Sequence, residues 1–307
     1  GIGFKNFPMD QFGVVKPELK KIARIPVLPG ASIADHTVQA TAVAESSYWQ
    51  GAEVRALSGE EFSAFGVSKE EGGVHLLDVP AGSLAAGAGL RKGDLVQAVD
   101  GKGTRTVDIL LEATDAAEGR PLRIKYVRGQ GASEETMTRY VYVATETTDG
   151  HFERLRILPA GDVAQIRRVS TKPATSNQPV ATLTDGKLAQ NYGPVFANGV
   201  TNGVYTAALG SDAPVAEIRT WSYNMGGNRG RQDFVLFAAA KSGTLSPIAT
   251  VSTGKSADFT ATGVKMSDGS ALGMFRIIEW RVRPVSKSNE NTALQELQVV
   301  AWRRGLP

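Results

Sequence analysis

A glycine-rich stretch at residues 82–96 constrains the fold of this chain more than any other segment. It reads Gly-Ser-Leu-Ala-Ala-Gly-Ala-Gly-Leu-Arg-Lys-Gly-Asp-Leu-Val. Ser83 is a typical N-cap of a short helix, and Gly89 stands where a left-handed residue can end that helix. A Gly-Asp pair then favours a turn into a strand over residues 95–99. A short helix between strands requires a mixed α and β domain here.

An amphipathic pattern follows this stretch. The spacing i, i+3, i+4, i+7 predicts a helix over residues 107–118, with its apolar face at Val107, Leu110, Leu111 and Thr114. Gly119 and Pro121 end the helix, and residues 122–127 are expected to return as a strand.

Several short motifs occur in a fixed order across residues 48–130. They are Gly73-Val74-His75-Leu76, Val79, Gly82-Ser83, Ala85, Ala88-Gly89-Leu90, Gly93-Asp94 and Tyr126-Val127-Arg128-Gly129. Together they resemble a bacterial PDZ domain, the type attached to high-temperature-requirement proteases. The resemblance implies an α+β PDZ domain, which we place at residues 46–130.

A PDZ domain usually binds a peptide C-terminus, which adds beside a strand while its carboxylate lies in a nest of backbone N–H groups. The resemblance implies a peptide-binding site formed by Trp49, Gln50, Gly51, Ala52, Val54, Leu110 and Leu111. This chain departs from the family because Gln50 and Ala52 stand where bulky apolar residues are preferred. Peptide docking and a structural spacer therefore remain as alternatives. The acidic insertion at residues 58–73 is a candidate cover for the groove.

The C-terminal segment has strand periodicity. Residues 274–283 contain an alternation in which Ile278, Trp280 and Val282 lie on one face and Glu279, Arg281 and Arg283 on the other. This alternation predicts a half-buried antiparallel strand with Trp280 in the core. Short strands separated by Gly and Asn turns favour an all-β sandwich, which we place at residues 176–307.

Five motifs of this segment keep a recognisable order. They are Leu183-Thr184-Asp185-Gly186-Lys187, Tyr192-Gly193-Pro194-Val195-Phe196, Thr220-Trp221-Ser222-Tyr223-Asn224, Asn228-Arg229-Gly230-Arg231-Gln232 and Leu294-Gln295-Glu296-Leu297. They resemble a galactose-binding-like (discoidin-type) jelly-roll β-sandwich, a fold often found as a carbohydrate-binding module. The resemblance implies a carbohydrate partner and a structural calcium ion held by Asp185 and Glu296. Calcium prefers six to eight oxygen ligands, which an Asp-Gly turn can supply in part. The alternative is an ordinary turn and a surface Glu.

Sugar binding needs a flat aromatic ring for the apolar sugar face and planar polar groups for the hydroxyls. The candidate carbohydrate-binding residues are Trp221, Tyr223, Asn224, Arg229 and Tyr192. Trp221 precedes a glycine-rich turn, which is consistent with an exposed ring, although aromatic residues of such sandwiches more often lie in the core. Arg229 is equally a candidate for pinning its own loop.

Composition argues against several function classes. The chain has no cysteine and three histidines, so thiol chemistry, cysteine-bound zinc and histidine-base catalysis have little to work with. From Ser176 onward 13 Lys and Arg face 9 Asp and Glu, an unclustered surplus that does not indicate nucleic-acid binding. No apolar run is long enough for a membrane span. An enzymatic alternative needs paired carboxylates, with Asp233, Glu279 and Glu290 as candidates.

Two connecting segments complete the expected organisation, an N-terminal extension at residues 1–45 and added strands with a linker at residues 131–175. Residues 1–14 resemble the tail that follows the last coil of secreted parallel β-helix proteins, many of which act on polysaccharides. This resemblance implies a bacterial protein that is secreted, periplasmic or on the cell surface. We therefore expect a non-catalytic accessory region that binds carbohydrate. The alternative is a PDZ-mediated protein interaction module with the sandwich as scaffold.

Overall fold

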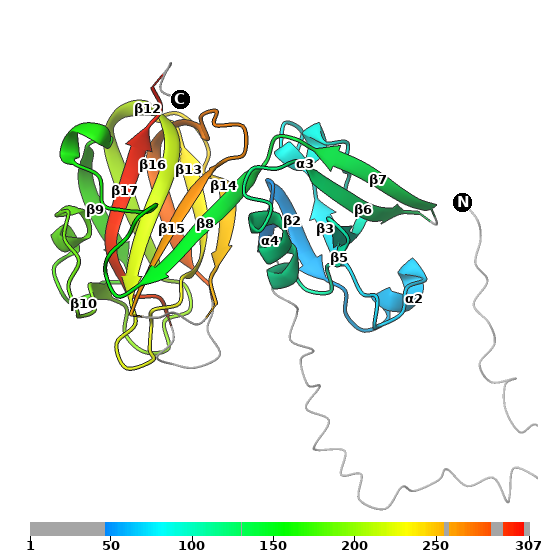
Figure 1. The fold of residues 1–307 in the computed structure, drawn as a ribbon, viewed down its shortest axis with the longest axis horizontal. Helices are drawn as coiled ribbons and strands as arrows, with labels where there is room; N and C mark the ends of the chain where they lie inside the picture. The colour runs from blue at the N-terminus through cyan, green and yellow to red at the C-terminus, as the bar shows by residue number, and fades with distance from the viewer. Residues whose placement is uncertain (1–46, 130, 255–257, 284–290, 304–307) are drawn as a thin grey trace, which may run out of the picture. The chain divides into compact units, whose positions relative to one another are not determined.

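The computed structural model describes residues 47–129, 131–254, 258–283 and 291–303. The expected N-terminal extension and its likeness to a β-helix tail lie outside the described residues, as does Glu290. The described part folds into an α+β region and an all-β sandwich, which confirms the fold class expected from the sequence (Figure 1).

The α+β region is built on one mixed-length antiparallel sheet of strand order β1-β2-β3-β4-β6-β7, with β5 paired to β4. Its strands are β1 (Ser47–Trp49), β2 (Ala52–Ala56), β3 (Val74–Asp78), β4 (Leu95–Val99), β5 (Lys102–Gly103), β6 (Leu122–Arg128) and β7 (Gly131–Met137). Its helices are α2 (Glu61–Phe65), α3 (Leu84–Gly87) and α4 (Val107–Asp115). The predicted strand at residues 95–99 coincides with β4, and the predicted helix at 107–118 ends three residues early, at Asp115.

Local capping explains where these helices begin. The Ser83 hydroxyl accepts a hydrogen bond from the Ala86 N–H, and the Thr106 hydroxyl accepts one from the Ile109 N–H. Gly89 has φ +86°, the left-handed conformation expected after α3. The predicted apolar face of α4 is buried at all four positions, and it packs into one core with β2, β3 and β4.

The sandwich contains most of the remaining strands. They are β8 (Val141–Thr148), β9 (Ile166–Lys172), β12 (Val204–Tyr223), β13 (Asp233–Ala239), β14 (Ser246–Ser252), β15 (Phe259–Met266), β16 (Gly273–Val282) and β17 (Leu294–Ala301). The 3-10 helices η3 (Ala160–Asp162) and η4 (Val180–Thr184) and the small pair β10 (Ser176–Asn177) and β11 (Pro194–Val195) lie in the connections.

The long strand β12 joins the two layers of the sandwich. Its first half pairs with β9 and β16, and its second half pairs with β15 and β17. The register shifts between Ala208 and Ala213, and strands of this kind change layers at such irregularities. Trp280 is fully buried between the layers, where its Nε1–H donates to the Thr220 hydroxyl at 2.9 Å. This confirms the predicted core position of Trp280.

Of the two strands that connect the regions, one belongs to each sheet. β7 extends the first sheet by pairing with β6, whereas β8 pairs with β15 at the edge of the sandwich sheet. β1 and α4 contact β14 and β8, so the α+β region rests against the sandwich through these elements. Figure 1 shows α4 beside β14 and β8.

Candidate functional site

Three of the five predicted carbohydrate-binding residues, Tyr192, Asn224 and Arg229, lie at one end of the sandwich, and Tyr223 adjoins them as the last residue of β12. This end, here called the loop end, consists of residues 191–203 and 224–232, next to the start and the finish of β12. The Tyr192 hydroxyl donates to the Met225 carbonyl at 3.2 Å, which ties the two loops together. Tyr192, Tyr223 and Asn224 are partly exposed, and Met225 is 39% exposed.

Arg229 lies beneath Tyr192 and holds the loop end in place. It is 8% exposed, and its guanidinium donates to the Phe196 carbonyl, to Asn291 and to the Asn198 side chain. The guanidinium lies 5.9 Å from the centroid of the Tyr192 ring. Burial lowers the pKa of Arg229. The structure therefore places Arg229 as the residue that pins the loop and braces the Tyr192 ring, the second of its two expected roles.

Trp221 corrects the sequence analysis, because it cannot present its ring to a ligand. It is fully buried on β12, and its Nε1–H donates to the Leu155 carbonyl at 3.0 Å. It packs with Leu155 and Ala261 under Phe152 and Ile157, from the segment that was expected to contain only added strands and a linker. The exposed position suggested by the following glycines was wrong because the strand continues through Tyr223 before the chain turns.

The remaining aromatic candidate, Tyr223, packs within its own sheet. It pairs with Phe259 of β15, and the two ring centroids lie 4.7 Å apart. Asn224 follows it, and its backbone N–H donates to the Asp258 carbonyl at 2.7 Å. Tyr192 and Tyr223 are both partly exposed, and Tyr192 differs in that its hydroxyl is fixed by the neighbouring loop.

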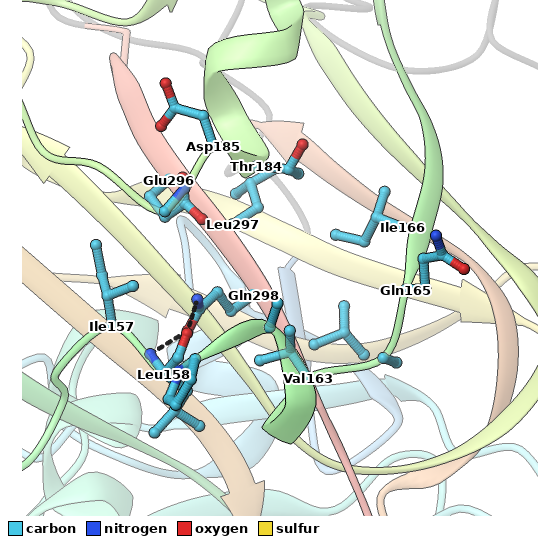
Figure 2. Close-up of a pocket in the computed structure, with 15 residues that line it drawn as sticks. Ile157, Leu158, Val163, Gln165, Ile166, Thr184, Asp185, Glu296, Leu297 and Gln298 are labelled. Carbon is cyan, nitrogen blue, oxygen red and sulfur yellow. Dashed lines mark hydrogen bonds between the residues drawn. The ribbon is translucent and has the colours of Figure 1, made fainter.

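A groove of about 900 Å³ runs along β17 (Figure 2). We call it the β17 groove; it lies between this strand, residues 157–166 and the turn at 184–186. Figure 2 shows Asp185 and Glu296 at one end, and the two hydrogen bonds between Gln298 and the backbone of Leu158 farther along. The walls are mainly aliphatic, from residues such as Ile157, Val163 and Ile166.

The structure brings the two predicted calcium ligands together in this groove. Glu296 is 1% exposed, and its Oε2 accepts a hydrogen bond from the Gly186 N–H at 3.2 Å. Burial raises the pKa of Glu296 to about 8, and the like charge of Asp185 adds to the increase. Within the described ranges no group of three or more His, Asp or Glu side chains could hold a metal ion. A cation here would depend on these two carboxylates together with carbonyl oxygens or water.

The predicted peptide-binding residues gather between β2 and α4, as expected, but they are not open to solvent. Apart from Gly51, all of them are buried: Trp49, Gln50, Ala52, Val54, Leu110 and Leu111. Gln50, the polar departure from the family pattern, donates its Nε2–H to the Val141 carbonyl at 2.7 Å and accepts from the Val141 N–H at 2.8 Å. The polar side chain of Gln50 therefore bonds to the backbone of β8, a strand of the sandwich.

Asp233 and Glu279, the two carboxylates considered for catalysis that lie within the described residues, do not form a pair. Asp233 bonds to Arg283 and Arg231, and Glu279 bonds to Arg281. In the register of β13 and β16, Glu279 lies opposite Phe237, four residues from Asp233. At roughly 3.3 Å per residue the separation is about 13 Å, beyond the roughly 5–9.5 Å used by glycoside hydrolases.

The sequence analysis missed the residues that join the two regions and brace the loop end. No sequence pattern marks these residues, because each bonds to a partner distant in the chain. They are Thr250, Val141, Asn198 and Asn291. The departure at Gln50 was the one available signal. Among the described helices none is long and apolar enough to cross a membrane.

Comparison with known proteins gives likenesses of fold. No family model and no curated protein matches the sequence. The HtrA3 PDZ domain bound to a phage-derived ligand (FGRWV) is 20% identical, with a TM-score of 0.26 over 30% of this chain and 85% of that one. The Clostridium perfringens module CpGH89CBM32-4, in complex with glcNAc-alpha-1,4-galactose, is 15% identical, with a TM-score of 0.34 over 46% of this chain and 93% of that one. The family 32 CBM of C. perfringens NanJ, in complex with galactose, is 15% identical, with a TM-score of 0.34 over 43% and 91%.

Proposed function

We propose that the sandwich is a non-catalytic carbohydrate-binding module whose ligand lies against Tyr192 at the loop end. The observation that carries this proposal is the fixed, partly exposed Tyr192 ring. Its hydroxyl is held by the Met225 carbonyl, and Arg229 supports the ring from the buried side. A rigid aromatic ring offers a large apolar contact at a low cost in conformational entropy, which suits the apolar face of a pyranose.

The surroundings of Tyr192 suit sugar hydroxyl groups. Asn224 and Asn228 lie in the loop that carries Met225, and carboxamide side chains both donate and accept hydrogen bonds. Met225 adds an adaptable apolar surface beside the ring. Galactose and N-acetylhexosamines are the first ligands to test, because sugars of this kind occupy the family 32 modules named above.

Calcium is a proposed structural cofactor of this module. Asp185 in the 184–186 turn and Glu296 on β17 both offer carboxylate oxygens to the same groove, and a buried carboxylate with a raised pKa gains most from a cation that neutralises it. The cation would hold the 184–186 turn against β17. The proposal further places the chain in a secreted or cell-surface bacterial protein that processes polysaccharide, which rests on the resemblance of residues 1–14.

The test is isothermal titration of the whole chain with galactose, N-acetylgalactosamine and N-acetylglucosamine, followed by a glycan array, each with calcium and with chelator. Tyr192→Ala is expected to weaken binding at least tenfold, because the stacking surface is removed. Trp302→Ala is the control, since Trp302 is an aromatic residue that bonds to the Gly269 carbonyl, away from the loop end. Absence of binding to every glycan, or equal binding by Tyr192→Ala, would contradict the proposal. Loss with chelator alone would support calcium and reject Tyr192.

A further inference from the structure

The groove between β2 and α4 is the place where an extended peptide would add to the sheet of the α+β region. Such a peptide forms backbone hydrogen bonds with the free edge of a strand and places side chains into the space beside it. On β2, a peptide would have to add at the edge that faces away from β3. Whether the domain can receive a partner therefore depends on what lies along this edge.

The chain itself lies along this edge. β1 pairs antiparallel with β2, with Ser47 opposite Val54, Tyr48 opposite Glu53 and Trp49 opposite Ala52. The two strands are joined by a tight turn at Gln50 and Gly51, whose φ angles of 53° and 79° are typical of a type I′ hairpin. Three residues of the chain therefore occupy the position of an added peptide strand.

The Trp49 side chain fills the space between the strand and the helix. The residue is 2% exposed and belongs to the same core as Leu110 and Leu111 of α4. Its Nε1–H donates to the Thr114 hydroxyl at 2.9 Å, and Thr114 in turn donates to the Leu110 carbonyl. An incoming apolar side chain would find this space already packed.

The outer edge of β1 is also taken, by the sandwich. The Thr250 hydroxyl accepts from the Tyr48 N–H at 3.1 Å and donates to the Tyr48 carbonyl at 2.7 Å. The Ser47 hydroxyl lies 3.0 Å from the Thr250 hydroxyl, and the Tyr48 ring packs edge-on against Phe237 at 5.6 Å. Polar groups on both edges of β1 are thus paired within the molecule.

We infer that Ser47–Trp49 is an internal ligand of the groove, so that the α+β region does not receive external peptides. An external peptide must displace a strand that is tethered by a two-residue turn and held by the sandwich. Tethering gives such a strand a high effective concentration. The cover is β1, whereas the insertion at residues 58–73 was the candidate suggested by the sequence. This inference is independent of carbohydrate binding.

Two measurements on the whole chain test the inference. The first is fluorescence polarisation with a labelled peptide of the chain's own sequence, Ala-Glu-Ser-Ser-Tyr-Trp with a free carboxylate, and with its amidated form. The wild type is expected not to bind at millimolar concentration, and the double variant Trp49→Ala/Thr250→Val is expected to bind at least tenfold more tightly than the wild type. Trp302→Ala is the control and is expected to behave like the wild type.

The second measurement is hydrogen exchange, which does not depend on the variant being folded. The Ser47–Trp49 amides are expected to exchange as slowly as those of β2 in the wild type. Peptide binding by the wild type that equals binding by the double variant would overturn the inference. A folded double variant that binds no peptide would also overturn it, as would exchange of Ser47–Trp49 as fast as that of an exposed loop. If the double variant does not fold, the exchange result decides.

Discussion

The groove between β2 and α4 and the loop end of the sandwich were both expected to bind ligands. In the structure the groove is covered by the chain itself, whereas the loop end keeps an aromatic ring partly exposed. Each is built around an aromatic residue that follows or precedes a turn. Trp49 is packed between a strand and a helix, whereas Tyr192 keeps part of its ring exposed while its hydroxyl and its buried face are held. An aromatic residue near a turn therefore indicates a binding surface only if no other part of the chain covers it.

The largest expected effect tests whether Trp49 is a core residue. Trp49→Ala should lower the free energy of unfolding by about 3–5 kcal/mol, because it removes a buried indole, leaves a cavity and removes the hydrogen bond that the Thr114 hydroxyl accepts. Urea unfolding followed by far-UV circular dichroism measures the change. A loss below about 1 kcal/mol, the size expected for a surface position, would show that the groove is open in solution.

A smaller effect is expected from pH at the contact between the α+β region and the sandwich. Asp115 of α4 accepts a hydrogen bond from the Val143 N–H at 2.8 Å, and burial raises its pKa to about 7 from 3.8. Between these values the unfolded chain loses the proton and the folded chain keeps it. The contribution of Asp115 to stability should therefore fall as pH rises from about 4 to 7 and then level off.

The matched variant for this pH dependence is Asp115→Asn, which keeps the acceptor for Val143. We expect the wild type to lose about 2 kcal/mol more than the variant between pH 4 and 8, less than the full shift implies because the side chain is partly exposed. Urea unfolding at both pH values gives the difference. Glu296 has a raised pKa in both proteins, so its contribution cancels in the comparison. Parallel pH curves would show that Asp115 is solvated and that the contact is loose.

The smallest expected effect is at the loop end. Tyr192→Ala should change the free energy of unfolding by less than about 1 kcal/mol, because the ring is partly exposed and Arg229 keeps its other partners. The same unfolding experiment measures it beside Trp49→Ala. A loss as large as that of Trp49→Ala would make Tyr192 a core residue and remove the contrast between the two surfaces.

Much of the local structure could be predicted because its causes are local. The cap at Ser83, the left-handed Gly89 and the apolar face of α4 involve residues within a few positions of one another. The alternation around Trp280 likewise predicted a strand with one buried face. The candidate sites were less predictable, because exposure depends on segments distant in sequence. Leu155 covers Trp221, and Thr250 closes the outer edge of β1.

The sequence by itself determined the fold class, the strand β4, the buried face of α4 and the strand around Trp280, because periodicity and capping act over short distances. Only the tertiary structure decided which of the candidate surfaces are open. Gln50 shows the reason: its carboxamide looked like a polar defect in a peptide pocket, and it bonds to the backbone of Val141, 91 residues away. A buried polar side chain needs a partner, and where the chain supplies that partner is settled only when distant segments pack together.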